Sequence, residues 1–415
     1  MSYTTAIHDF SPTLFSHRGR RRPGATGILS MPTRLLCDAV PFCFGPAAAL
    51  EALLRELGSA AELSHEVEVL ATGSTREFLE RSDLPLSLLA VDSEDPEALA
   101  GLDLRPYSAF LTLCNPVSWR VLRSRGLPTA YVDFLLWMHS GPPGDHFGAD
   151  LYLAENYPGT AEWVRRRGRE IPSLVVIPPL VQPAVRSAKP GSLLVGFGGM
   201  YSRLTIPGIN TNYASYIADQ LLAAVPPGRF ERVLFAGPQG LKPLLEPRLR
   251  HFPGASFHSF SHRAFLRALG ECEAFLSHPG LYAPFEAMLG GVPTGFLPPS
   301  NYTQILQLRH FRACGMADFS FSWDDLGADP IPSDLPEPEG VAAVLLAIAS
   351  AERSRETSVA FQAALTAFLS LDTAQLEELG ARQRTAAAQF SSGGPRVAAQ
   401  HVRRWCQLLN RPTFA

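Results

Sequence analysis

The chain has 415 residues, of which 46% are hydrophobic and 18% are charged, enough to fill the cores of two ordinary α/β domains. The formal net charge of −3 gives no electrostatic reason to expect nucleic acid or an acidic membrane as a partner. The six cysteines are scattered and show no zinc-like spacing, which favours free thiols in a reducing cytoplasm over a disulfide framework.

The first thirty residues lack the apolar run of a secretory signal and carry an arginine cluster next to glycine. We therefore expect a disordered extension over residues 1–30, with the folded part starting at Met31. No stretch approaches the roughly 20 apolar residues that a membrane span needs, so a cytoplasmic protein without a membrane partner is expected.

From residue 31 onward, strand-like apolar runs alternate with helical patterns. A buried strand over 33–40 leads into a helix over 46–57, whose first position suits Pro46. Ser74 and Glu77 have the spacing of a capping box at the start of another helix. Further strands are predicted over 66–72, 86–91, 108–114, 129–135 and 150–155. This alternation predicts a parallel sheet with helices on both faces.

A proline-rich segment over 173–192 predicts the last strand of a first domain and a linker, after which the alternation restarts. Strands are predicted over 192–199 and 231–237, and helices over 212–225, 262–272 and 302–315, the last with Gly315 as a C-cap. Successive helices are predicted from about 338 to 410. The predicted domains are therefore 31–185 and 186–390, followed by a helical tail over 391–415.

Glycines follow the predicted strand at 192–199, in the sequence "GFGGMYSR". Gly198 and Gly199 would let backbone N–H groups approach an oxyanion, and Arg203 would offer a fork of donors to phosphate. The pattern is not the GxGxxG fingerprint, so a nicotinamide cofactor is not expected.

A second cluster lies in "FLSHPGLYAPFEAMLGGVPTGFLPP", over 275–299. His278 and Gly280 stand between a strand and a helix, where the helix N-terminus suits an anion such as a diphosphate. Glu286, further along that helix, could accept the two hydroxyls of a ribose. Gln304 lies at the start of the next helix, where its amide could bond neighbouring sugar hydroxyls.

Taken together, "SHPG…FEAMLGGVPTGFLPPSNYTQILQ" resembles the donor-binding segment of GT-B glycosyltransferases. The resemblance implies an α/β fold of two Rossmann-like domains facing across a cleft, with a C-terminal helix that crosses back to the first. It implies a UDP-sugar donor, no cofactor and no metal ion. It would place His278 and Gly280 at the diphosphate, Glu286 at the ribose and Gln304 at the sugar. Thr303 stands where the family has an acidic residue, which leaves the donor sugar open.

The stretches "CDAVPFCFGPAAALEALLREL" and "LATGSTREFLERSDLP" resemble cytosylglucuronate and hydroxymethylcytosylglucuronate synthases of nucleoside-antibiotic biosynthesis. That resemblance implies inverting transfer of a glucuronosyl group from UDP-glucuronic acid to cytosine or hydroxymethylcytosine. The predicted stacking surfaces for such a base are Phe42 and Phe44 in the first loop, with Tyr131, Phe134 and Trp137 at a later strand end. Arg203 or Arg309 would meet the carboxylate of a uronic acid.

The transfer needs a general base that deprotonates the acceptor nitrogen. Asp38, at the end of the first strand, is the first candidate, and Asp133 and His139 are the alternatives. His139 with Asp145 and His146 also suggests metal ligands. The segment between His139 and Asp145 is rich in glycine and proline and no fourth ligand is evident, so a metal site is not expected.

Several other functions fit the same pattern. The chain could glycosylate another natural-product acceptor, or it could bind sugar nucleotides without catalysis. A sugar-nucleotide 2-epimerase shares this fold, and a two-domain solute-binding protein also has twin α/β halves. A homodimer is compatible with each of these functions.

Overall fold

The computed structural model describes residues 34–58, 66–200, 208–209, 211–390 and 392–409. All of them belong to one compact unit, which spans 31–415. The extension predicted over 1–30 lies outside the described residues.

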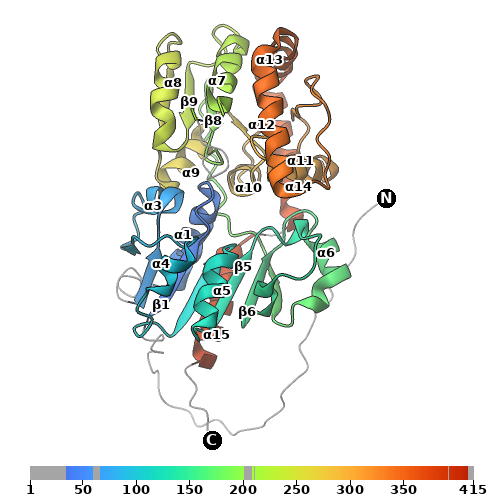
Figure 1. Ribbon diagram of the computed structural model, residues 1–415. Helices are drawn as coiled ribbons and strands as arrows, with labels where there is room; N and C mark the ends of the chain where they lie inside the picture. Colours follow the sequence, from blue (N-terminus) through green and yellow to red (C-terminus); the bar gives the residue numbers. More distant parts are fainter. Residues whose placement is uncertain (1–33, 59–65, 201–207, 210, 391, 410–415) are drawn as a thin grey trace, which may run out of the picture. The chain divides into compact units, whose positions relative to one another are not determined.

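Strands of the first half form a seven-stranded parallel sheet in the order β3-β2-β1-β4-β5-β6-β7. Figure 1 labels β1, β5 and β6 of this sheet. Its strands are β1 (Leu35–Ala39), β2 (Val67–Leu70), β3 (Ser87–Leu89), β4 (Ala109–Leu113), β5 (Thr129–Asp133), β6 (Leu151–Glu155) and β7 (Leu174–Ile177). The central strands are fully buried, as expected for a sheet covered on both faces.

Helices alternate with these strands, as predicted. They are α1 (Gly45–Leu57), α3 (Gly73–Leu79), α4 (Pro96–Ala100), α5 (Pro116–Ser124) and α6 (Thr160–Arg167), with short 3₁₀ turns η1 (Leu136–Met138), η2 (Asp145–Gly148) and η3 (Gly168–Glu170). α1 begins at Gly45, so Pro46 is its second residue and not the first as predicted, although it still lies in the first turn. The capping box predicted at Ser74 is wrong: α3 starts earlier, Thr72 is its N-cap, and no side chain caps it.

The second half forms a five-stranded parallel sheet in the order β10-β9-β8-β11-β12. Its strands are β8 (Ser192–Gly196), β9 (Arg232–Ala236), β10 (Ala255–His258), β11 (Ala274–Ser277) and β12 (Thr294–Phe296). Its helices are α7 (Tyr213–Ala224), α8 (Lys242–Leu249), α9 (His262–Glu271), α10 (Tyr282–Leu289) and α11 (Tyr302–Ala313), with the turn η4 (Gln239–Leu241). β10 is a short, half-buried edge strand that was not predicted from the sequence.

The successive helices predicted from about 338 to 410 are α12 (Glu337–Arg353), α13 (Arg355–Leu369), α14 (Thr373–Ala387), the turn η5 (Ala388–Phe390) and α15 (Gly394–Leu409). α15 packs against α1, β6 and β7 of the first half. Its apolar face, which includes Val402 and Trp405, enters the core around the first sheet. Arg403 also connects α15 to the end of α1, since its Nε donates to the carbonyl of Leu57 at 3.0 Å. The C-terminal helix therefore returns to the first domain.

The core around the first sheet also includes side chains of the second half. Leu281, Tyr282 and Phe285, at the start of α10, belong to it together with residues of β1, β4 and α1. The start of α10 is thus held from both halves of the chain. In the part of the chain that the structure describes, no helix is long and apolar enough to cross a membrane.

Candidate functional site

A pocket opens where loops from both sheets meet at the carboxyl ends of the strands. Its walls come from the loop after β1, the loops after β5 and β8, and the beginnings of α9, α10 and α11. The predicted site residues among its lining are Phe42, Phe44, Gly198, Gly199, His278, Gly280, Glu286 and Gln304. Arg203 lies outside the described residues.

The N-terminus of α10 lines this pocket with Leu281, Tyr282 and Ala283. Leu281 is the N-cap, and no side chain accepts a hydrogen bond from the first turn of the helix. Free N–H groups at a helix N-terminus, together with the positive end of the helix dipole, form an anion site. The local sequence explains the missing cap, because "HPGL" offers no Ser, Thr, Asp or Asn at the N-cap position.

His278 stands just before this helix and is almost fully buried. The backbone N–H of Gly199 donates to its Nε2 at 3.1 Å, so the ring proton belongs on Nδ1. Burial lowers the pKa of His278 to about 4, and the ring is therefore neutral at pH 7. Its Nδ1 is buried and has no hydrogen-bond partner. The pocket thus contains an N–H donor that is not hydrogen-bonded to any described residue of the protein.

Gly199 is required by close packing. A Cβ there would lie 2.7 Å from Cε1 of His278 and 3.2 Å from Nε2 of Gln304. The oxygen of Gln304 accepts hydrogen bonds from the N–H and the hydroxyl of Ser300, at 2.8 and 3.0 Å. The Gln304 amide is therefore oriented with its nitrogen toward Gly199 and the pocket.

Glu286 forms a buried ion pair that sequence analysis did not foresee. Its Oε1 lies 2.7 Å from Nε2 of His262, whose Nδ1 lies 3.5 Å from Oε2 of Glu51 on α1. Burial opposes charge on His262, but the two carboxylates raise its pKa to about 10. The pocket therefore contains an imidazolium at pH 7. His262 follows the turn after β10. Because that strand was not predicted, His262 was not recognised as a residue at the carboxyl end of a strand.

Contacts between the two halves close the pocket on one side. The N–H of Phe44 donates to the carbonyl of Gly198 at 3.1 Å, and Sγ of Cys43 donates to that of Gly199 at 3.0 Å. Cys43 has a φ of 62°, which is uncommon for a residue with a side chain. The loop after β1 thus takes a tight conformation directly against the glycine turn after β8.

Trp137 and Arg309 do not line this pocket. Trp137 donates from its indole to the carbonyl of Phe134 at 3.1 Å, and its ring packs edge-on against His310. Arg309 donates to the carbonyl of Ile331 at 2.6 Å. Of the other predicted rings, Phe134 lines the pocket and Tyr131 does not. Three phenylalanine rings that were not predicted also line it: Phe78, Phe260 and Phe265.

Asp38 is fully buried and does not line the pocket. The side-chain amide of Asn115 donates to its Oδ2 at 2.9 Å and also to Ser93. Burial raises the pKa of Asp38 to about 7. Side chains alternate along a strand, and the neighbours Cys37 and Ala39 face the core around α1. Asp38 therefore points to the opposite face of the sheet.

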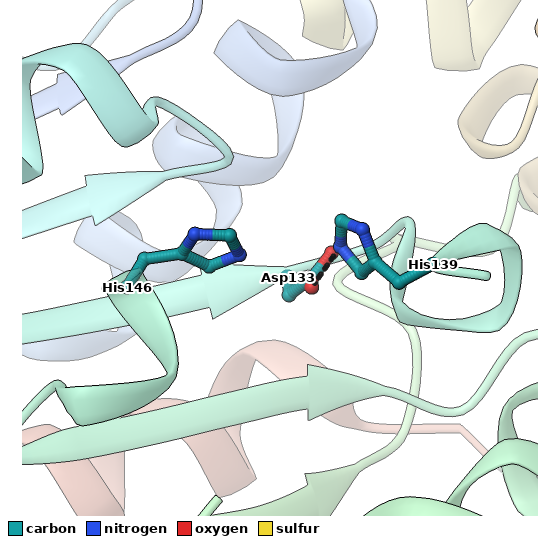
Figure 2. A group of neighbouring side chains, drawn as sticks. All are labelled: Asp133, His139 and His146. Carbon is teal, nitrogen blue, oxygen red and sulfur yellow. Dashed lines mark hydrogen bonds and ion pairs between the residues drawn. The ribbon is translucent and has the colours of Figure 1, made fainter. Parts of the chain in front are cut away.

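Asp133 and His139 form a pair outside the pocket, with Oδ2 and Nε2 3.0 Å apart. Burial works against charge on both groups, but their mutual attraction raises the pKa of His139 and lowers that of Asp133. His146 lies on the other side of Asp133 (Figure 2). Asp145, which the sequence grouped with the histidines, instead pairs with Arg120 at the surface.

Comparison with known proteins shows the fold. No family model matches the chain, and no curated protein matches its sequence. Among solved structures, Os79 from O. sativa in complex with UDP matches with a TM-score of 0.53 and 14% identity, over 91% of this chain and 100% of that one. UGT89C1 from Arabidopsis thaliana, complexed with UDP, matches with a TM-score of 0.50 and 14% identity, over 90% and 99%.

These matches and the two parallel sheets with a returning C-terminal helix give the fold class as GT-B, as predicted. At this level of identity the similarity shows the fold alone.

Proposed function

We propose that this chain is a UDP-sugar-dependent glycosyltransferase and that the pocket is its donor site. The observation that carries the proposal is the buried, unpartnered Nδ1 of neutral His278 beside the uncapped N-terminus of α10. Both offer N–H donors, and a diphosphate supplies the matching acceptors and negative charge.

The remaining pocket residues fit the rest of such a donor. Glu286 could accept hydrogen bonds from ribose hydroxyls, since a carboxylate has room for several donors. The amide nitrogen of Gln304 could donate to the sugar. Phe260, which is half-buried at the pocket wall, offers a flat apolar surface for the uracil ring. The matched structures of Os79 and UGT89C1 contain UDP, which supports UDP as the first ligand to test.

Isothermal titration calorimetry with UDP tests the donor site. Glu286→Ala should weaken UDP binding by more than ~10-fold, which corresponds to about 1.4 kcal/mol. Glu339→Ala, an exposed residue in the first turn of α12, is the matched control and should bind UDP like the native protein. Equal affinity in native protein and Glu286→Ala would remove Glu286 from the site.

As specific substrates we propose UDP-glucuronic acid and cytosine or hydroxymethylcytosine, on the resemblance of the N-terminal stretches. Purified protein would be incubated with both substrates and the products identified by mass spectrometry. UDP together with a glucuronosylated base supports this pair. UDP without a conjugate keeps the donor and rejects the acceptor, which turns the search to other natural-product acceptors.

As the general base we propose Asp38, because a pKa of about 7 suits proton transfer at neutral pH. Its side chain is fully buried on the sheet face opposite α1, so the proposal requires the acceptor to reach the end of β1 from that face. Asp38→Asn keeps the shape and should lower kcat about 100-fold while UDP affinity is unchanged. A native kcat would leave Asp38 with a structural role only.

A sugar-nucleotide-binding protein without catalysis is the second candidate. None of the three residues proposed as the general base, Asp38, Asp133 and His139, lines the donor pocket. UDP binding with no turnover on any acceptor would favour it.

A further inference from the structure

A cluster of three side chains lies at the carboxyl end of β5, outside the donor pocket (Figure 2). Asp133 ends β5, His139 follows the turn η1, and His146 belongs to the turn η2. One ligand atom from each residue can be chosen so that all three lie within 4.8 Å of one another. Three segments of the first half thus bring two imidazoles and one carboxylate to a single point.

The orientation of Asp133 is fixed by its outer contacts. Its Oδ1 accepts a hydrogen bond from the N–H of Leu135 at 2.6 Å and from Sγ of Cys114 at 3.4 Å. Oδ2 is left to face Nε2 of His139, 3.0 Å away, and the hydroxyl of Tyr152. Hydrogen bonds that hold one carboxylate oxygen and direct the other toward the ligand point are typical of metal sites.

The hydrogen bond between Asp133 and His139 does not explain why His146 lies next to them. Its Nε2 is buried and has no hydrogen-bond partner, although a buried imidazole nitrogen is normally paired. The ring stacks on Tyr131 with centroids 4.6 Å apart. It also lies so close to Gly144 that a Cβ there would be 2.3 Å from its Cε1. The ring is thus placed with an unused nitrogen beside a carboxylate and a second histidine.

We propose that Asp133 Oδ2, His139 Nε2 and His146 Nε2 bind one divalent transition-metal ion, with Zn²⁺ as the first candidate. Two imidazoles and one carboxylate are a known zinc ligand set, and the hydroxyl of Tyr152 donates a hydrogen bond to Asp133 Oδ2. Ligand atoms about 2.1 Å from Zn²⁺ stand about 3.4 Å apart. Closing the site therefore requires a shift of His146 by at most ~1.5 Å.

The segment that carries His146 permits this shift, because the preceding residues 140–143 are exposed. A bound ion would tie η1 and η2 to β5 and so fix the segment that starts with Phe134 and Leu135, which line the donor pocket. The ion would thus stabilise the pocket wall formed by Phe134 and Leu135 without entering the pocket. The sugar transfer proposed above has no step that needs it.

Zinc binding is measured on untagged full-length protein that has been stripped with a chelator. Titration calorimetry with ZnCl₂ should give one saturable site per chain, and Co²⁺ should produce a visible absorption band at the same stoichiometry. The melting temperature should rise by a few degrees with excess Zn²⁺, since the ion binds only the folded chain.

His146→Phe is the decisive variant. Phenylalanine keeps the ring stack on Tyr131 but removes the nitrogen, and no hydrogen bond of Nε2 is lost. We expect an unchanged or higher melting temperature without metal and a Zn²⁺ affinity at least ~100-fold lower. His251→Ala, an exposed histidine in the second half, is the control and should keep native Zn²⁺ affinity.

Three results would overturn the proposal: no saturable binding of Zn²⁺ or Co²⁺, native affinity in His146→Phe, or an equal loss of affinity in His251→Ala. The experiment contains neither UDP nor sugar. Its outcome is therefore independent of the proposed glycosyltransferase activity.

Discussion

At the scale of single residues, the donor pocket combines a neutral and a cationic histidine. His278 is kept neutral by burial without a charged partner, whereas His262 is kept cationic by Glu286 and Glu51. The same side chain thus takes two charge states within one pocket because its neighbours differ. The neutral ring can donate one N–H, and the charged ring fixes the position of Glu286.

The ion pair of His262 predicts a pH dependence of stability. Its pKa rises from 6.5 to about 10 on folding, so the stabilisation is fully present below pH 6.5 and is lost as the pH rises toward 10. Within that window the free energy of unfolding should fall by up to about 1.4 kcal/mol per pH unit.

Chemical denaturation of native protein and His262→Gln at several pH values checks this prediction. The groups that face His262 are Glu286, Glu51 with its partner Arg55, and the ring of Phe78. The stability difference between the two proteins should shrink from pH 6.5 to pH 10. A difference that stays constant over this range would contradict the assigned charge.

Gly199 provides a steric test at the same scale. Gly199→Ala would place a Cβ 2.7 Å from the ring of His278, and the ring must move away from its hydrogen bond to the Gly199 N–H. We expect UDP affinity to fall by at least ~10-fold. Gly240→Ala meets no atom within 4 Å and should bind UDP normally, as measured by calorimetry. Equal affinities would mean that His278 does not contact the ligand.

At the scale of elements, α10 and α15 connect the two halves. The start of α10 enters the core around the first sheet, and α15 lies against α1. The chain therefore crosses between the halves by its linker and again by its last helix. Apolar burial at these contacts stabilises the arrangement of the loops that line the pocket.

Trp405→Ala tests the role of α15. Trp405 is 6% exposed in the core around α1, so truncation should lower the free energy of unfolding by about 3–5 kcal/mol. Leu408→Ala, at a position that is 51% exposed on the same helix, should change it by less than ~0.5 kcal/mol. Denaturation curves of the two variants give the comparison, and equal curves would exclude a stabilising contact of α15 with α1.

At the scale of the whole molecule, the donor site depends on a hydrogen bond between the halves. The hydroxyl of Tyr282, the first residue of α10, donates to Oε1 of Glu155 at the end of β6, at 2.9 Å. Glu155 is fully buried and also accepts from the N–H of Leu180 at 2.7 Å. The helix that would hold the diphosphate is thus positioned by a residue of the other sheet.

Tyr282→Phe should lower both stability and UDP affinity, because the start of α10 loses its hydrogen bond to Glu155. We expect a stability loss of about 1 kcal/mol together with weaker UDP binding. Tyr107→Phe removes a bond of the same kind, to Glu68 within the first half, and should lower stability alone. If both variants bind UDP equally well, the bond to Glu155 does not position the site.

The sequence by itself determined most of the strand and helix order, the two-sheet fold class and several of the residues that line the pocket. Strand–helix alternation is a local pattern, and parallel strands bring the residues that follow them to one edge of the sheet. That is why Gly198, His278 and Gln304 could be named in advance, although their contacts with UDP are still predictions.

Only the tertiary structure decided which distant side chains meet. His262 joins Glu51 across more than two hundred residues, and Asp133 replaces Asp145 as the neighbour of His139 and His146. The direction of Asp38 at its strand end also depends on which sheet face meets α1. Periodicity encodes local order, whereas these contacts depend on loop paths and on packing between segments far apart in the chain.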